Sequence, residues 1–298
     1  MALLPRVVVV HRRTELDELL ERHGTRGQAE FFLRTRGRTL ADVQGHHDAQ
    51  QDALRRVRAA IPGDWRRGDA ERADLHRFGF EPGDVCVVVG QDGLVANTAK
   101  YLDGQPVLGI DPEPGRNPGV LVTHPSAAAA ALLLAVAGGT ARLQPRAMVR
   151  ASLDDGQHLD ALNEVFVGHP SHQSARYRLT APDSRAPERQ SSSGLIAASG
   201  TGSTGWAASL HGERRLPPAL PGVDDAFLSW FVREAWPSPT TGTALTDGLI
   251  GAGEVLSVLV ESDALVVFGD GLEVDRLTAT WGQTIELATS PRVLQLVG

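Results

Sequence analysis

An unbroken apolar run, Val85–Val89, leads directly into Gly90-Gln91-Asp92-Gly93. A strand that is apolar on both faces is typical of the middle of a parallel sheet, where helices cover both sides. A helical stretch over 94–102 and a second apolar strand, Val107–Ile110, follow the glycine loop. Strand, loop, helix and strand in this order predict a β-α-β unit and hence a parallel α/β domain.

The residues before this unit fit the same domain. Arg6–Val10 has the composition of a strand, and the sequence predicts helices over 15–23, 28–35 and 40–60. Thr14-Glu15-Leu16-Asp17 is typical of the start of a helix, where a threonine caps the first turn. Residues 62–79 are polar, and we expect them to be irregular.

Beyond Gly139 the sequence changes to short strand-like runs separated by Pro, Gly, Ser and Asp. Such spacing is typical of an all-β domain. The runs are Ala147–Ala151, Glu164–Val167, Tyr177–Leu179, Leu195–Ala197, Glu254–Val260, Ala264–Phe268, Leu277–Thr280, Thr284–Leu287 and Val293–Val297. We therefore expect an α/β domain over 1–140, which carries the glycine loop, and a sandwich-like β domain over 141–298.

The composition argues against several classes of function. A net charge of −7 disfavours a nucleic-acid surface, which needs clustered positive charge. The apolar run Ala127–Ala137 is too short to cross a membrane and ends at Gly138-Gly139. A strand begins almost at once and leaves no room for a removable presequence, so we expect a cytoplasmic protein with no membrane partner. Cys86 is the single cysteine, which excludes an intrachain disulfide.

Lys100 is the only lysine, so contacts to anions must come mainly from arginine, backbone amides or hydroxyl groups. It lies two turns along the helix that follows the glycine loop. A solvated helix face is the favoured interpretation, and contact with a phosphate is the alternative. The histidines at 46, 47, 169 and 172 lack the spacing and the further ligands of a metal site, so no protein-bound metal is expected.

The glycine loop is the first candidate site. Glycines let the chain approach a phosphate closely, and the N-terminal amides of the next helix point at the same place. Asp92 could take the proton from a hydroxyl group that attacks a phosphate. An ordinary Asp-Gly turn would explain the same residues without any function.

Two further motifs lie in the β-rich half. Asn163-Glu164 places an amide beside a carboxylate, which together can hold ribose hydroxyls or a polar base edge. Gly200–Trp206 has the glycine spacing of a dinucleotide-binding fingerprint, but the proline-rich stretch 214–221 follows it instead of a helix and a strand. This loop can still wrap a diphosphate or a ribose, and Trp206 can stack on a ring. The structural alternatives are an exposed turn and a loop with Trp206 in the core.

In this order and spacing, the three motifs resemble those of the NAD kinases, closest to the mitochondrial type and its bacterial relatives. The likeness runs from about residue 84 to the end of the chain. The supporting strings are Val107–Pro112 with Arg116, Ala161–Gly168, Ser192–Leu195 leading to Gly200–Trp206, and Phe268–Gly271, which is similar to the family's Asp-Gly strand. The resemblance implies an α/β domain followed by a β-sandwich that binds NAD.

The resemblance also implies a transferase that phosphorylates the 2′-hydroxyl of the adenosine ribose of NAD(H) to give NADP(H). Asp92 would orient or deprotonate this hydroxyl, and the backbone of Gly90, Gln91 and Gly93 would hold the donor phosphates. The dinucleotide would be held by Asn163, Glu164, Thr201, Ser203, Thr204, Gly205, Trp206 and Ser209. Magnesium would arrive with ATP and neutralise charge on the phosphates. Because family members are usually dimers or tetramers, the resemblance implies a homodimer or a homotetramer.

Two residues of the glycine loop depart from the family pattern. Gln91 replaces a glycine and Leu94 replaces a threonine, both on the donor side, so the donor (ATP, polyphosphate or another) and turnover itself stay open. A non-catalytic NAD(P)-binding sensor on the same fold is one alternative. A kinase for a lipid or another hydroxyl, related to the diacylglycerol kinases, is the second. Asn163-Glu164 and the Gly200–Trp206 loop disfavour it, because a lipid offers no second nucleotide for them to hold.

Overall fold

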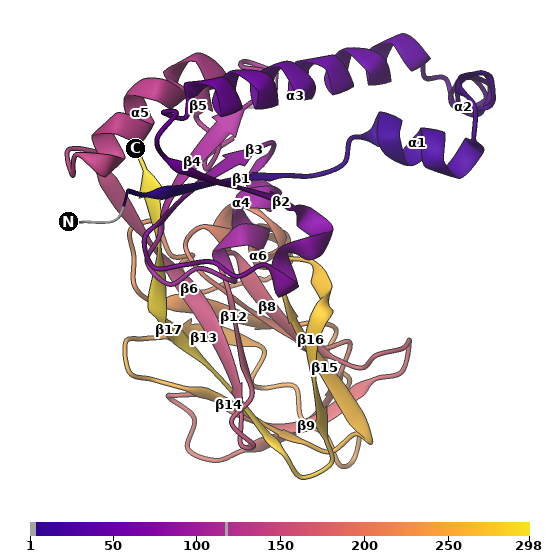
Figure 1. Ribbon diagram of the computed structural model, residues 1–298. Helices are drawn as coiled ribbons and strands as arrows, with labels where there is room; N and C mark the ends of the chain where they lie inside the picture. Colours follow the sequence, from indigo (N-terminus) through magenta and orange to yellow (C-terminus); the bar gives the residue numbers. More distant parts are fainter. Residues whose placement is uncertain (1–3, 117–118) are drawn as a thin grey trace. The chain divides into compact units, whose positions relative to one another are not determined.

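A computed structural model describes residues 4–116 and 119–298, which form two compact units (Figure 1). The first unit contains the residues up to Thr98, Gln105–Gln144 and Gln295–Gly298. The second unit contains Ala99–Gly104 and Pro145–Leu294. The fold class expected from the sequence is confirmed, because an α/β region with parallel strands is followed by an antiparallel β region.

The first unit is built on parallel strands in the order β2-β1-β3-β4. Their bounds are Arg6–His11 for β1, Arg66–Glu71 for β2, Asp84–Val89 for β3 and Pro106–Asp111 for β4. Every residue of β3 is buried, as its unbroken apolar run predicts. β5 (His124–Pro125) and the last residues of β17 (Thr284–Val297) also pair with β4 in parallel.

Helices cover this sheet and extend beyond it. They are α1 (Glu15–His23), α2 (Arg26–Arg34), α3 (Leu40–Ala60), α4 (Asp92–Ala99) and α5 (Ala129–Ala137), with 3-10 turns at Arg72–Arg77 and Ser126–Ala128. α3 and α5 share one apolar core with β1, β3 and β4. α1 and α2 instead pack on the N-terminal part of α3 through Leu16, Leu33 and Val43 (Figure 1).

Two predictions about local structure have clear outcomes here. The capping box at Thr14 is confirmed, since its side chain accepts the N–H of Asp17 and the Asp17 carboxylate accepts the N–H of Thr14. The expectation that residues 62–79 are irregular is wrong, because β2 and a 3-10 turn lie there. β2 is an edge strand with one buried residue, Ala70, and charged side chains are common on such edges.

The second unit contains two antiparallel sheets. One has β10-β9-β14-β17 in order, and the other has β13-β12-β11-β8-β15-β16. The further bounds are Leu143–Leu153 (β6), His158–Ala161 (β7), Glu164–Gly168 (β8), Ala175–Thr180 (β9), Glu188–Ser192 (β10), Leu195–Ala198 (β11), Leu228–Val232 (β12), Asp247–Ile250 (β13), Leu256–Val260 (β14), Ala264–Gly269 (β15) and Leu272–Thr280 (β16). A 3-10 turn at Gly202–Thr204 leads to the short helix α6 (Trp206–Gly212).

Side chains from both sheets of the second unit form one core, which is the packing of a β-sandwich. Tyr177 and Trp230 are the largest side chains fully buried in it. The two runs Thr284–Leu287 and Val293–Val297 were expected as separate strands, but they form the single strand β17. The strand continues through Pro291, which is exposed and has no N–H to leave unpaired. Among the described residues, no helix is long and apolar enough to cross a membrane.

Candidate functional site

The glycine loop lies where the strand order of the first unit reverses. Along the chain, β1 is followed by β2 on one side of it and then by β3 on its other side. In open α/β sheets, ligands bind outside the carboxyl ends of the strands at such a point. β1 leads into Arg12 and Arg13, and β3 leads into Gly90–Gly93, so these segments border the crevice that the topology predicts.

A pocket of about 680 Å³ occupies this position. Its wall carries four carboxylates (Glu15, Asp92, Asp111, Glu113) and four guanidinium groups (Arg12, Arg13, Arg38, Arg116). Three of the arginines are paired with carboxylates, as Arg13–Glu21, Arg38–Glu15 and Arg116–Glu113. Arg12 is exposed and has no ion pair among the described residues. A ligand with several phosphates would compete with the carboxylates for these four arginines, because charge-assisted contacts from arginine to phosphate are strong.

The carboxylate of Asp92, the first residue of α4, is held by the main chain. Its Oδ2 accepts the N–H of Val120 at 2.8 Å, and its Oδ1 accepts those of Leu121 and Val122, both at 3.0 Å. A Cβ atom at Gly119 would lie 2.4 Å from Oδ1, so this approach requires glycine. An ionised carboxylate has about four acceptor positions, so one position on Oδ2 stays open to a ligand hydroxyl.

The other residues of the glycine loop differ in exposure. Gly90 is buried, whereas Gln91 and Gly93 are exposed. Gln91 also lines the pocket, so its side chain can meet a bound phosphate. Leu94 is 3 % exposed and lies under the loop, where a Cβ atom at Gly90 would be 3.2 Å from its Cδ2. Leu94 therefore fills the core beneath the loop and offers no polar group to a ligand.

In the second unit, the turn between β7 and β8 carries Asn163 and Glu164. The main-chain N–H groups of Leu162 and Asn163 donate to the carboxylate of Asp270 at 2.7 Å, and that of Glu164 donates at 3.3 Å. Asp270 joins β15 to β16 with a φ of 52°, which is rare for residues other than glycine. Asp270 and Asp92 thus act alike, since each precedes a glycine and binds three consecutive N–H groups.

The side chains of Asn163 and Glu164 are half-buried, and neither has a hydrogen bond or an ion pair to any described residue. Burial, and then the charge of Asp270, raise the pKa of Glu164 to about 7. Burial also raises the pKa of Asp270 to about 6, although its main-chain hydrogen bonds and the charge of Lys100 act in the opposite direction. A half-buried carboxylate with a raised pKa and no protein partner is a candidate for ligand binding.

The segment after β11 is joined to this turn by Ser199. Its N–H donates to the carbonyl of Asn163 at 2.9 Å, and its hydroxyl donates to the carbonyl of Leu162 at 2.5 Å. The same hydroxyl accepts the N–H of Thr201 at 3.2 Å and of Gly202 at 3.4 Å. A Cβ atom at Gly202 would lie 2.2 Å from the Asn163 carbonyl oxygen, so only glycine fits there. Two of the three predicted motifs therefore form one cluster.

The hydroxyl groups of the 200–206 loop have different surroundings. The hydroxyl of Ser203 donates to the carbonyl of Pro221 at 2.7 Å, which ties the loop to the segment before β12. Thr201 is 6 % exposed, and its Oγ1 has no hydrogen-bond partner among the described residues. Thr204, Gly205 and Ser209 are exposed. Thr201 is thus the loop residue whose buried hydroxyl most clearly lacks a hydrogen-bond partner among the described residues.

Trp206 begins α6 and stacks on the ring of Phe166, with 5.6 Å between the centroids and 13° between the planes. The guanidinium of Arg233 lies 4.9 Å from the centroid of the Trp206 ring. Trp206 is half-buried and packs against the small core under α6. Stacking of Trp206 on a ligand ring stays a prediction, since Phe166 already covers part of the indole.

Both interpretations of Lys100 are wrong. The residue is 6 % exposed, so it does not lie on a solvated helix face. Its ammonium group donates to Asp275 Oδ1 at 2.8 Å and to the carbonyl of Gly269 at 3.3 Å, so it does not lie free for a phosphate. The partners are about 170 residues away in sequence, and no local pattern could have predicted them.

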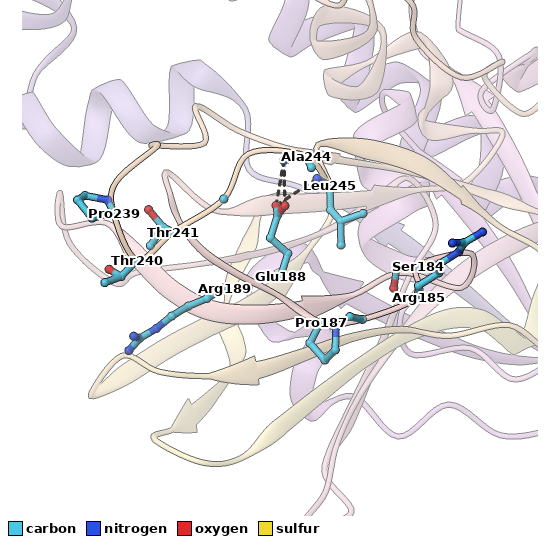
Figure 2. A pocket seen from close by; sticks show the side chains of 12 residues that line it. Ser184, Arg185, Pro187, Glu188, Arg189, Pro239, Thr240, Thr241, Ala244 and Leu245 are labelled. Carbon is cyan, nitrogen blue, oxygen red and sulfur yellow. Dashed lines mark hydrogen bonds between the residues drawn. The ribbon is translucent and has the colours of Figure 1, made fainter.

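A second hollow, of about 530 Å³, lies in the second unit between residues 184–189 and 239–245. Figure 2 shows the Glu188 carboxylate turned toward Ala244 and Leu245. It accepts the N–H of Ala244 at 3.0 Å and that of Leu245 at 3.1 Å. None of the residues that the sequence predicted for the site lines this hollow. Glu188 therefore holds a loop in place, and its carboxylate is taken up by main-chain N–H groups.

Sequence reasoning missed Ser199 and gave Asp270 no role beyond its place in a motif. Ser199 directly precedes the Gly200–Trp206 loop. From this position a serine hydroxyl can bond the main chain two and three residues further on, so the sequence did contain a signal for its role. The residues described, 4–116 and 119–298, contain no group of three or more His, Cys, Asp or Glu that could hold a metal ion.

Comparison with known proteins gives one partial relative. No family model matches the chain. Over 140 residues the chain is 37 % identical to a protein of Methylococcus capsulatus named NAD kinase, in an alignment that covers 45 % of this chain and 47 % of that protein. The chain thus matches about half the length of this relative.

Proposed function

We propose that this chain is an NAD kinase, which transfers a phosphoryl group to the 2′-hydroxyl of the adenosine ribose of NAD(H) and forms NADP(H). The observation that carries the proposal is the ordered set of three motifs, of which Asn163-Glu164 and Gly200–Trp206 form one cluster in the second unit. The partial identity to an NAD kinase supports the same activity.

In this proposal Asp92 accepts the hydrogen bond, and then the proton, of the attacking 2′-hydroxyl at the open position of Oδ2. The three main-chain N–H groups hold the carboxylate in one orientation, so little reorganisation is needed when the reaction occurs. The main chain of Gly90, Gln91 and Gly93 and the arginines of the pocket bind the donor phosphates. ATP is the proposed donor, and polyphosphate is the other candidate.

The dinucleotide is proposed to bind at the turn of the second unit. Asn163 and Glu164 supply an amide and a carboxylate for ribose hydroxyls, and Thr201 supplies a buried hydroxyl that has no described protein partner. The rest of the wall would come from Ser203, Thr204, Gly205, Trp206 and Ser209.

Magnesium is proposed to enter with the donor. It prefers oxygen ligands, keeps several waters and is usually held by substrate phosphates together with one or two carboxylates. Asp111 and Glu113, which line the same pocket as Asp92, would be its protein ligands. Mg²⁺ would supply neutralisation of the phosphate charge during transfer. We further propose that the protein acts in the cytoplasm as a homodimer or a homotetramer.

One observation favours the non-catalytic NAD(P) sensor as a second candidate. Three of the four acceptor positions of Asp92 are used by the main chain, which is also what a purely structural aspartate would show. A sensor would bind the dinucleotide at the Asn163 turn without transferring phosphate. The lipid kinase alternative leaves that turn and the unpartnered Thr201 hydroxyl without a ligand.

A matrix of donors and acceptors separates these functions. Purified protein is incubated with ATP or polyphosphate and magnesium, and with NAD, NADH or diacylglycerol vesicles as acceptor. We expect NADP or NADPH with at least one donor, and far slower formation of this product in Asp92→Asn. Tight NAD binding with no phosphorylated product would favour the sensor, and phosphorylated lipid would favour the third class.

A further inference from the structure

Lys100 is a buried cation with two partners in the second unit. Its side chain is 2 % exposed, and its ammonium group contacts Asp275 Oδ1 at 2.8 Å and the Gly269 carbonyl at 3.3 Å. The hydroxyl of Tyr101 donates to the other oxygen of Asp275 at 2.7 Å. Lys100 and Tyr101, which directly follow α4, thus bind β16 through Asp275, and Lys100 also binds the end of β15 through Gly269.

Gly269 is the residue before Asp270, whose carboxylate binds the N–H groups of residues 162–164. The pairing of β15 with β16 is irregular between Val267 and Gly269, whereas on its other side Gly269 pairs regularly with Val165 of β8. The left-handed conformation of Asp270 adds strain. Lys100 adds a side-chain contact on the Gly269 carbonyl, next to this irregular pairing.

A buried ion pair is costly, because two charges leave water, and apolar residues of similar volume in place of both partners would be as stable or more stable. What the ammonium group supplies that an apolar side chain cannot is a directed contact to one carbonyl and one carboxylate. Those contacts act together with the pairing of β15 with β8 and the bond from the Asp270 N–H to the Glu164 carbonyl, which hold Asp270 beside the 162–164 turn.

We propose that Lys100 is a positioning residue for the Asn163-Glu164 turn: through Gly269 and Asp275 it holds Asp270 in place, and Asp270 holds the three amides of the turn. The part of this proposal that concerns the orientation of the turn rests only on these contacts. Its effect on dinucleotide affinity rests on the proposed function.

The test compares Lys100→Met, which keeps the length and burial of the side chain, with Lys100→Arg, which keeps the charge. Glu261→Gln is the matched control, because it removes the partner of Arg178 and Arg189 elsewhere in the same unit. The readouts are hydrogen exchange of the amides of residues 162–164, the affinity for NAD, and KM for NAD and for the donor.

In Lys100→Met we expect exchange at 162–164 to speed up, and NAD affinity to fall, by roughly tenfold each, the size of one lost hydrogen bond to a charged group. KM for NAD should rise while KM for the donor stays the same. Lys100→Arg should recover part of both effects, and Glu261→Gln should change neither.

Unchanged exchange at 162–164 in Lys100→Met would overturn the proposal, whatever the protein binds. If exchange speeds up while the wild-type protein itself binds no NAD, the positioning role stands and the proposed function fails. Faster exchange with unchanged NAD affinity would show that the turn does not bind the dinucleotide and would remove the functional part of the inference.

Discussion

Glu164 offers a sharp test because its charge changes near neutral pH. Burial and the charge of Asp270 raise its pKa from 4.5 to about 7. In the proposed complex the ionised carboxylate accepts hydrogen bonds from ribose hydroxyls, so protonation removes an acceptor. We expect NAD to bind well above pH 7 and to lose affinity as the pH falls through 7.

The magnitude follows from the pKa. If only the ionised form binds, the apparent Kd is about tenfold higher at pH 6 than at pH 8, or ~1.4 kcal/mol. The unliganded protein responds in the opposite sense. Because the pKa of Glu164 is higher in the folded than in the unfolded chain, protonation stabilises the fold as the pH falls through 7. This gain is about 1 kcal/mol between pH 8 and pH 6, allowing for partial exposure of the side chain.

Calorimetric titration with NAD at several pH values from 6 to 8, at constant ionic strength, measures how the Kd depends on pH. Urea unfolding over the same pH range measures the free energy of unfolding of the unliganded protein. Glu164→Gln should bind NAD weakly and lose most of the pH dependence, keeping only the part near pH 6 that protonation of Asp270 adds. Glu286→Gln, at an exposed position of β17, should behave as the wild type. Affinity that is constant with pH in the wild type, or that keeps its full slope in Glu164→Gln, would refute the reasoning.

Three further predictions concern single residues. Asp92→Asn should keep its NAD affinity within about twofold but lose turnover by roughly 10²–10⁴-fold; unchanged turnover would remove Asp92 from the mechanism. Gly202→Ala should weaken NAD binding by tenfold or more, at a cost of about 1–3 kcal/mol, because its methyl group would overlap the Asn163 carbonyl. Gly212→Ala, where a methyl group meets nothing within 4 Å, is its control, and equal affinities in the two would contradict the packing argument. Gln91→Gly should lower KM for ATP if Gln91 crowds the donor phosphates, and a higher KM would show that its side chain helps to bind them.

Much of the fold could be predicted because its signals are local. The apolar run of β3 and the capping box of Thr14 depend on neighbouring residues and on well-known geometry. β2 was missed because its residues are charged, and an edge strand needs few apolar side chains. Strand propensity cannot reveal such an element without the parallel neighbour β1, with which it pairs.

The site was predictable only in parts, because some of its contacts join residues that are far apart in the sequence. The proximity of Asn163 to the 200–206 loop was inferred from resemblance, and the hydroxyl of Ser199 and the glycine at 202 give it a physical basis. Lys100 was misinterpreted because its partner Asp275 is 175 residues away. Whether a lysine is buried is decided by such distant partners and not by the helix that precedes it.

The hydroxyl group that carries the new phosphate decides whether the proposed activity is correct. Product from a reaction with NAD, magnesium and the active donor is analysed by phosphorus–carbon correlation NMR, which identifies the esterified hydroxyl. We expect a phosphate on the 2′-oxygen of the adenosine ribose, formed by the wild type and formed far more slowly with Asp92→Asn. A phosphate on any other hydroxyl, or NAD that binds and returns unmodified with every donor, would contradict it.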